Sequence, residues 1–232
     1  MTTLLDEDEP TWFPDPMNFD DDGLVAVSEK LGTERLIEAY KRGIFPWMKM
    51  DFAPHFWCWF SPNPRMVLLP EKLKISKSLN RVIQKKKFEI KVDHGFTETM
   101  RACAYAERPK QEATWIEEDM IRDYSELHSL GIAHSIEAFL DGKRVGGLYG
   151  LAMGKVFFGE SMFSTVPDAS KVCLAYLVEL SQQAGVELID CQVHTSHLES
   201  MGGEEIPRKQ YLNSIRSLAS SSKSVIDWTV FQ

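Results

Sequence analysis

The sequence predicts an α+β fold in which helices flank a mixed sheet, and three observations support this prediction. Residues 133–164 contain three successive strand-like runs, separated by the two-residue turn signal Asp141-Gly142 and by Gly154. The next stretch, residues 168–184, has helical character and opens at Asp168 or Ser170. It leads into the apolar run 186–193, which is typical of a buried strand. We therefore expect three antiparallel strands, a crossover helix and a further strand.

The segments before this sheet are less regular. Residues 1–22 predict an acidic extended arm with a few anchored aromatic residues, because FPDP (Phe13 to Pro16) fits neither a helix nor an inner strand. Thr33 is a candidate cap for a helix that Gly43 ends and whose apolar stripe consists of Leu36, Ile37 and Tyr40. The following stretch to residue 65 holds Trp47, Trp57 and Trp59 among four prolines, and predicts a rigid, irregular segment with a small aromatic core. The expected units are the arm at 1–22, a small N-terminal domain at 23–65 and a larger domain at 66–232.

Further helices and strands complete the larger domain. We expect helices at 76–84, 95–104 and 117–130, an alternating strand at 88–93, a short helix that begins at Pro207, and a final strand in VIDWTVF (225–231). Helices followed by three antiparallel strands, a crossover helix and one more strand are the order found in acetyltransferases of the GNAT type. The predicted fold class is therefore an acetyltransferase-like mixed sheet with flanking helices, preceded by the small N-terminal domain.

The charge is distributed unevenly along the chain. The net charge is −8, yet residues 1–22 alone hold eight acidic residues and no Lys or Arg, so the remainder is neutral on balance. Residues 71–91 carry eight basic residues against two acidic ones. This basic patch suits phosphate binding, with a solvated helix face as the alternative. We interpret the acidic arm as a disordered solubility tail in preference to a nucleic-acid mimic that shields the patch.

The composition also suggests the compartment. The longest apolar runs are too short to span a membrane, and the acidic start does not resemble a signal peptide. The four cysteines form no CxxC pair, so we expect free thiols in the reducing cytoplasm.

Two carboxylates inside apolar runs mark the candidate site. Glu160 lies in FFGESMFS, while Asp190 and Gln192 lie in IDCQV. Carboxylates are seldom buried without a partner or a function. The motif GESMF lacks the second glycine of a nucleophile elbow, so Ser161 is a weak candidate nucleophile. No GxGxxG or GxxxxGK[ST] phosphate loop is present, and His194 lacks a ligand cluster, so no metal is expected.

The start of the predicted crossover helix argues against coenzyme A. Acyltransferases of this fold hold the pyrophosphate of coenzyme A on a Gly-rich turn, whereas STVPDASK contains no glycine and carries Asp168. We therefore expect no cofactor and a different acyl donor. The basic patch with its aromatic neighbours points to an aminoacyl ester on tRNA.

The motifs FPDP, RGIFPW, WFSPNPR, ATWI, AHSIE, VGGLYG, GESMFS, ASK, IDCQV and EIPR together resemble the leucyl/phenylalanyl-tRNA–protein transferase family over roughly residues 10 to 215. The resemblance implies an aminoacyltransferase, here expected as a cytoplasmic monomer without membrane contact. It implies transfer of Leu or Phe, with Met as a third candidate donor, from aminoacyl-tRNA to proteins beginning with Arg or Lys. The product would be marked for degradation by the N-end rule.

The resemblance also implies roles for individual residues. Trp47, Trp115 and Tyr124 are expected to bind the aminoacyl-adenosine end of the tRNA. The expected pocket for the donor side chain consists of Leu148, Phe157, Leu174 and Leu177, flanked by Met162, Phe163 and Ser164; Leu177 departs from the Phe of the family. The tRNA phosphates are expected to lie on Lys72, Lys74, Lys77, Arg81, Lys85, Lys86 and Lys87.

Glu160, Asp190 and Gln192 match the polar centre of that family. Aminolysis of an ester needs a neutral amine, a route for its proton and stabilisation of the oxyanion. Gln192 is expected to orient the amine while Asp190 fixes Gln192, and Glu160 to recognise a cationic N-terminal residue or a group of the donor. Either Asp190 or a hydroxyl of the tRNA could accept the proton. The alternatives are a small-molecule N-acyltransferase and a non-catalytic tRNA-binding protein.

Overall fold

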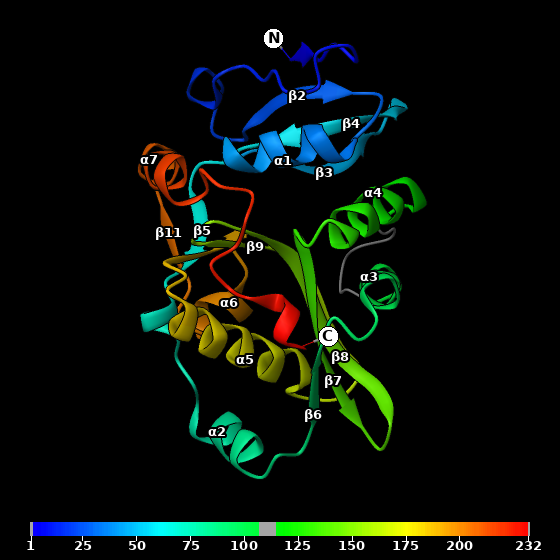
Figure 1. Ribbon diagram of the computed structural model, residues 1–232. Helices are drawn as coiled ribbons and strands as arrows, with labels where there is room; N and C mark the ends of the chain where they lie inside the picture. The colour runs from blue at the N-terminus through cyan, green and yellow to red at the C-terminus, as the bar shows by residue number, and fades with distance from the viewer. Residues whose placement is uncertain (1, 107–114, 232) are drawn as a thin grey trace.

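A computed structural model describes residues 2–106 and 115–231 and contains two sheets (Figure 1). The smaller sheet belongs to the N-terminal part of the chain, and helix α1 (Thr33–Lys41) lies between it and the larger part (Figure 1). Its strands, in the order in which they pair, are β1 (Thr3–Leu4), β2 (Leu24–Ser28), β4 (Ala53–Phe60) and β3 (Phe45–Met50).

The larger sheet has the predicted mixed topology. Strands β6 to β9 are antiparallel in series, and α5 (Ala169–Ala184) crosses over to β10, which is parallel to β9. The acetyltransferase-like order of elements is thus confirmed. In pairing order the strands are β11 (Glu204–Ile206), β5 (Arg65–Leu68), β10 (Leu188–Gln192), β9 (Val156–Ser164), β8 (Lys143–Met153), β7 (Ala133–Leu140) and β6 (Glu89–Val92).

The two faces of this sheet are covered by different elements. One face packs against α5 and the C-terminal segment; the other packs against α3, α4 and the N-terminal part, so the latter joins the larger part through a shared core. Apart from α1 and α5, the helices are α2 (Lys77–Gln84), α3 (Phe96–Ala104), α4 (Glu118–Ser129), α6 (Ser196–Ser200) and α7 (Arg208–Leu218). Short 3-10 turns are η1 (Pro16–Asn18), η2 (Pro70–Lys72) and η3 (Trp228–Phe231).

The prediction of a segment without regular secondary structure around the tryptophans was wrong, because β3 and β4 form an antiparallel pair there, with register shifts after Pro46 and after Lys49. The alternating side chains of Trp57 and Trp59 both point into the core and are fully buried. Pro46 lies on the edge strand β3, where a missing N–H costs no inner ladder bond. The many prolines therefore obscured the alternating pattern of these strands, although prolines at these positions are compatible with strands.

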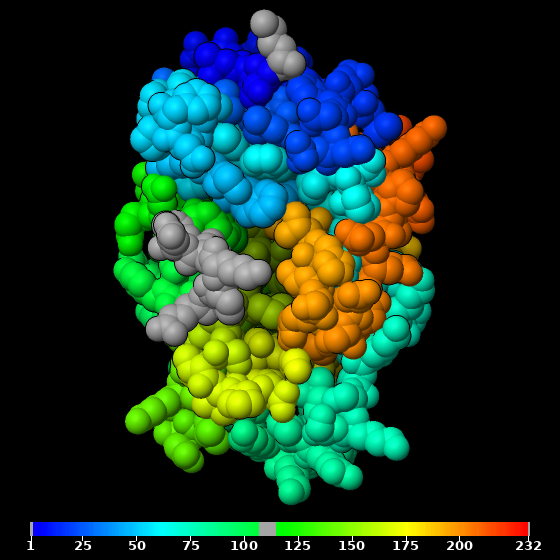
Figure 2. Space-filling model, turned by 180° about the vertical axis from the view of Figure 1, so that it is seen from behind, coloured from blue at the N-terminus to red at the C-terminus, as the bar shows by residue number. Residues whose placement is uncertain are grey.

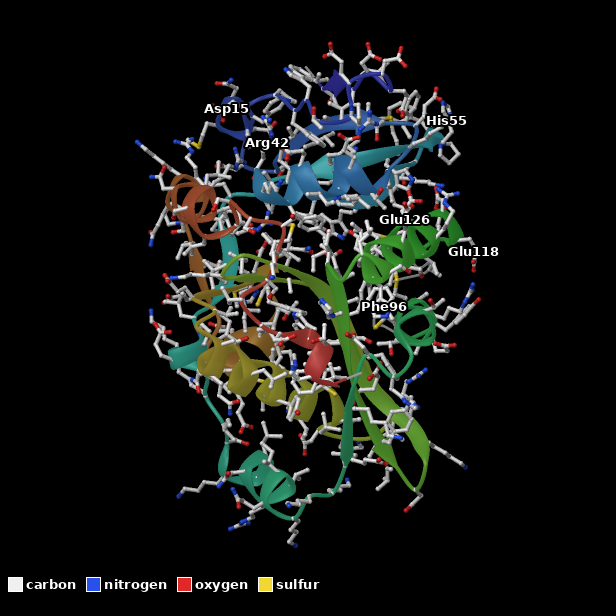
Figure 3. All side chains as sticks on the ribbon, viewed as in Figure 1. Asp15, Arg42, His55, Phe96, Glu118 and Glu126 are labelled. Atoms are coloured by element: carbon white, nitrogen blue, oxygen red, sulfur yellow. The ribbon has the colours of Figure 1, made fainter. Side chains whose placement is uncertain are left out.

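The prediction of a disordered acidic tail was also wrong. β1 pairs in parallel with β2, and Phe13 is buried with its ring 5.2 Å from that of Trp59. The buried Arg208 guanidinium donates hydrogen bonds to three backbone carbonyls of the arm, those of Pro16, Phe19 and Asp20. The arm lies at the opposite end of the molecule from α2 in Figure 1, and Asp15 is labelled there in Figure 3. It therefore does not shield the basic patch.

Two smaller expectations also differ from the structure. The segment 225–231 ends in the 3-10 turn η3, and Trp228 stacks on His134 at 4.1 Å where a paired strand was expected. The N-cap of α1 is Gly32, so Thr33 is the first helical residue and not the cap. α5 does open at Asp168, as expected: Asp168 is its N-cap, although its backbone is left-handed and its side chain makes no capping hydrogen bond.

The cysteines and the helices can each be compared with what the sequence predicts. All four cysteines are free thiols, as expected, and three of them are buried. In the part of the chain that the structure describes, no helix combines the length and the apolar character needed to cross a membrane.

Candidate active site

The candidate site lies where strands β9 and β10 stop pairing. Their ladder ends at Phe158 and Asp190, although β9 continues to Ser164. A bulge in the β8–β9 ladder places Glu160 opposite no residue of β8, which re-aims its side chain. Figure 2 shows a hollow on this face, between the N-terminal sheet, α4 and the orange segment after β10, with olive atoms of the β8–β9 region at its floor.

Glu160 is the centre of a buried hydrogen-bonded cluster drawn from four elements. Tyr40 on α1 donates its phenolic O–H to Glu160 Oε1 at 2.6 Å, and Gln192 Nε2 donates to the same oxygen at 2.8 Å. Tyr124 on α4 donates to Oε2 at 3.2 Å, and its phenolic oxygen lies 2.6 Å from that of Tyr40, so one of the two phenols also shares its proton across that contact. Burial raises the pKa of both phenols well above 10, so they remain donors at neutral pH.

This environment raises the pKa of the Glu160 carboxyl to about 7, so that it ionises near neutral pH. Burial raises its pKa, the three hydrogen-bond donors lower it, the Asp190 charge raises it further, and the net pKa is about 7. A carboxylate offers roughly four lone-pair positions, and three are occupied here. The remaining position, on Oε2, can accept one further N–H or a proton.

Asp190 is fully buried, and unlike Glu160 it has no free lone-pair position for a further hydrogen bond. Arg65 grips it with two hydrogen bonds, from Nε to Oδ1 at 2.9 Å and from Nη2 to Oδ2 at 2.6 Å. Tyr211 O–H donates to Oδ2 at 2.7 Å, and the backbone N–H of Gln192 donates to Oδ1 at 2.9 Å. These four donors occupy the roughly four lone-pair positions of the carboxylate.

Asp190 holds Gln192 through its backbone and not through its side chain. Its φ of 64° lies in the left-handed region, which is uncommon for a residue other than glycine. The bond from its N–H to Asp190 fixes this conformation, and the side-chain amide then reaches Glu160. The expectation that Asp190 fixes Gln192 thus has a specific route, along the main chain.

The residues expected to line the donor pocket lie mainly on the opposite face of the sheet. These residues belong to the apolar cluster that packs against α5. Tyr40 and Tyr124 belong to the cluster on the other face. β9 and β10 no longer pair beyond Phe158, and this strand opening lies between the two clusters. The α5-side residues are Leu148, Phe157, Met162, Leu174 and Leu177.

The other expected site residues are more scattered. Trp47 and Trp115 are half-buried and pack against the core that contains Tyr124, as does the buried Phe163. Ser164 is exposed and donates its hydroxyl to the carbonyl of Val166. Two residues of the ATWI motif, Ala113 and Thr114, lie outside the described residues.

The basic patch lies on and around α2. Lys72 is paired with Glu204, and Lys87 lies over the ring of Phe88. Figure 1 places α2 at the end of the molecule remote from the N-terminal sheet, so the patch does not line the strand opening.

Sequence reasoning missed three residues that complete the site. Tyr40 looked like one apolar position of a helix stripe, and Tyr211 lay in a helix with no marked pattern. Arg65 was taken as the end of a loop, although it directly precedes the apolar run MVLL. A charged residue at the border of a buried strand was the available signal for Arg65.

One group of side chains outside this site resembles a metal-binding set. Asp93, His128 and His134 each offer an atom within 4.8 Å of the others. His134 Nδ1 lies 2.7 Å from the Asp93 carboxylate and its Nε2 lies 3.1 Å from the Gly131 carbonyl; His128 Nδ1 lies 2.8 Å from the Ala133 carbonyl. Hydrogen bonds within the protein therefore account for this cluster.

The crossover topology defines the acetyltransferase-like fold class, and the buried polar cluster at the strand opening is its candidate site. Comparison with known proteins gives the family. The family described as leucyl/phenylalanyl-tRNA protein transferase matches residues 67–216, and the one described as its N-terminal domain matches residues 29–63. The chain therefore belongs to the leucyl/phenylalanyl-tRNA–protein transferase family, as its motifs predicted.

Individual relatives agree with this assignment. Leucyl/phenylalanyl-tRNA–protein transferase of Nitrosomonas eutropha is 50% identical over 206 residues, which cover 89% of this chain and 86% of the relative. The transferase of Paraburkholderia phytofirmans is 51% identical over 210 residues, covering 89% and 84%. Among solved structures, FemX is 9% identical with a TM-score of 0.46, covering 83% of this chain and 74% of that one. A likeness at this level says nothing about activity.

Proposed function

We propose that this chain transfers Leu or Phe, with Met as a third donor, from aminoacyl-tRNA to the N-terminal α-amine of proteins beginning with Arg or Lys. The observation that carries the proposal is the single open acceptor position of Glu160 beside Gln192. It lies at a strand opening behind which apolar residues of the α5 face are available for a donor side chain. Family membership supports the same reaction.

The proposed chemistry is aminolysis of an ester that is already activated. The α-amine of the acceptor attacks the ester carbonyl carbon, a C–N bond forms, and the C–O bond to the tRNA ribose breaks. Glu160 Oε2 accepts a hydrogen bond from one N–H of the amine and then accepts that proton. The proton afterwards passes to the departing ribose oxygen. Gln192 Nε2 is engaged with Glu160, so its side-chain oxygen orients the second N–H of the amine.

Asp190 has a different task in this proposal. Its four hydrogen-bond donors leave no position for the amine proton, so Asp190 holds Gln192 and is not the base. A group that must accept and then return a proton near pH 7 needs a pKa close to 7. The pKa of Glu160 is about 7.

The choice of the donor amino acid depends, in this proposal, on the apolar residues on the α5 side of the sheet. A methylene group in a hydrophobic pocket discriminates by about 1–3 kcal/mol, so one snug pocket admits Leu and Phe while it rejects polar side chains. Leu177, where the family has Phe, favours a roomier pocket. The tRNA body is proposed to lie on the α2 patch through its phosphates, without sequence reading. The products are proposed to be targets for N-end-rule degradation.

The test is transfer of labelled amino acids between purified components. Leu-, Phe- and Met-tRNA are offered as donors, and peptides beginning with Arg, Lys or Glu as acceptors. We expect labelled peptide with Leu and Phe as donors and with Arg or Lys at the acceptor terminus, and little with Glu. Absence of labelled product from every donor, with the chain folded, contradicts the proposal; product formed from acetyl-CoA in its place would establish the small-molecule alternative.

A further inference from the structure

Arg65 joins four parts of the molecule at a fully buried point next to the site. It is the first residue of β5, and its side chain meets Asp190 of β10, the Tyr211 ring of α7 at 4.5 Å and the Phe45 ring of β3 at 4.6 Å. Its Nη1 donates to the carbonyl of Gly43 at 3.3 Å. The planar guanidinium is therefore held between two rings and by hydrogen bonds to both the N-terminal part and the larger sheet.

The position of the Asp190 carboxylate depends on this guanidinium. Two parallel N–H···O bonds fix both the distance and the plane of the carboxylate. Burial by itself lowers the pKa of Arg65, but the Asp190 charge outweighs it and holds that pKa above its ordinary value. The Arg65 guanidinium is thus charged in the folded chain.

The fixed carboxylate in turn determines the backbone of Gln192. Asp190 Oδ1, which accepts from Arg65 Nε, also accepts the N–H of Gln192, the residue in the left-handed conformation. A left-handed conformation is disfavoured for a residue with a Cβ, so it needs such a partner. In that conformation the Gln192 amide lies 2.8 Å from Glu160.

We infer that Arg65 is a positioning residue for the transfer reaction. By orienting Asp190 it keeps Gln192 in the conformation that directs its amide to Glu160 and to the attacking amine. The inference rests on the proposed function, since Arg65 itself reaches neither Glu160 nor the strand opening. A purely structural role is the competing explanation, because a lone buried charge is destabilising whatever its neighbours do.

The test compares two conservative substitutions of buried arginines. Arg65→Lys keeps the charge but loses the paired donors, and Arg208→Lys makes the same change where the side chain binds only the arm. The values of kcat and KM for Leu-tRNA are measured with a peptide beginning with Arg and are scaled to the folded fraction from circular dichroism. Loss of a positioning contact lowers kcat and leaves KM nearly unchanged.

We expect Arg65→Lys to lower kcat about ten- to hundredfold, the range typical of a reacting group displaced by an ångström. Its KM for Leu-tRNA should stay within about threefold of that of the unaltered chain, and Arg208→Lys should change neither constant by more than about threefold. Equal kcat for Arg65→Lys and the unaltered chain, or an equal loss in Arg208→Lys, overturns the inference. No transfer by the unaltered chain overturns the proposed function and the inference with it.

A second variant covers the case in which Arg65→Lys does not fold. Arg65→Met combined with Asp190→Asn removes both charges, so no lone charge is buried. The amide at position 190 cannot be gripped by two parallel donors, and we expect the same loss of kcat in a folded protein. A folded double variant with the kcat of the unaltered chain overturns the inference.

Discussion

Replacement of Glu160 by Gln separates the stability of the site from its activity. The carboxyl of Glu160 is surrounded by Tyr40, Tyr124 and Gln192 and has a pKa of about 7, against 4.5 in an unfolded chain. The folded protein therefore binds this proton more tightly than the unfolded chain does. Between pH 4.5 and 7 the folded state holds more protons, so the free energy of unfolding falls as the pH rises.

The size of the effect follows from the same two values. At about 1.4 kcal/mol per pH unit, the change from 4.5 to about 7 corresponds to about 3 kcal/mol, lost once the pH exceeds 7. Gln is uncharged at every pH and loses nothing. For a chain of this length about 1 kcal/mol moves the melting temperature by about 2–4 °C. About 2.5 kcal/mol of this loss falls between pH 5 and pH 8, so the advantage of Glu160→Gln over the unaltered chain should be about 5–10 °C larger at pH 8 than at pH 5.

The assay is thermal unfolding followed by circular dichroism at both pH values, with transfer activity measured in parallel. Glu205→Gln, at an exposed position of β11, is the control and should show the same difference at both pH values. Glu160→Gln should lose most transfer activity while it gains stability at pH 8. An unchanged gap between pH 5 and pH 8, or a variant less stable than the unaltered chain at pH 8, refutes the reasoning.

Three other outcomes follow from the same contacts. Arg65→Met should lower the free energy of unfolding in urea by about 3–5 kcal/mol, because it leaves Asp190 as a lone buried charge, and adding Asp190→Asn should recover most of that loss. Arg208→Ala should free the carbonyls of the acidic arm and speed its cleavage by a protease; unchanged cleavage would show that the arm is held otherwise. Lys86→Glu should weaken tRNA binding and flatten its salt dependence, whereas Lys143→Glu on the β7–β8 hairpin should do neither; equal effects would remove α2 as the tRNA surface.

The sheet could be predicted because its signals are local. Asp141-Gly142 marks a hairpin, alternation marks the strands on either side, and the helical run before the last strand marks the crossover. Glu160 and Asp190 could be found because a carboxylate inside an apolar run is rare. Each of these judgements uses residues that are close together in the sequence.

The partners of those carboxylates could not be found in the same way. Arg65 is 125 positions from Asp190, and Tyr40 is 120 positions from Glu160, so only the folded chain brings each pair together. Tyr40 fitted an apolar helix stripe, and its hydroxyl had no visible destination. The strands β3 and β4 were missed because prolines outweighed the alternation. The arm was misjudged as disordered because its acidic residues were given more weight than its anchored aromatic residues, among them the buried Phe13.

The central claim is that Glu160 accepts the proton during aminoacyl transfer. The direct measurement is the single-turnover rate of Leu transfer from tRNA to a peptide beginning with Arg, at pH values from 5.5 to 9, for the unaltered chain and for Glu160→Gln. The ratio of the two rates cancels the titration of the peptide amine, which both reactions share. This ratio should rise through a midpoint near the Glu160 pKa of about 7 and then level off. A ratio that does not change with pH would contradict the claim.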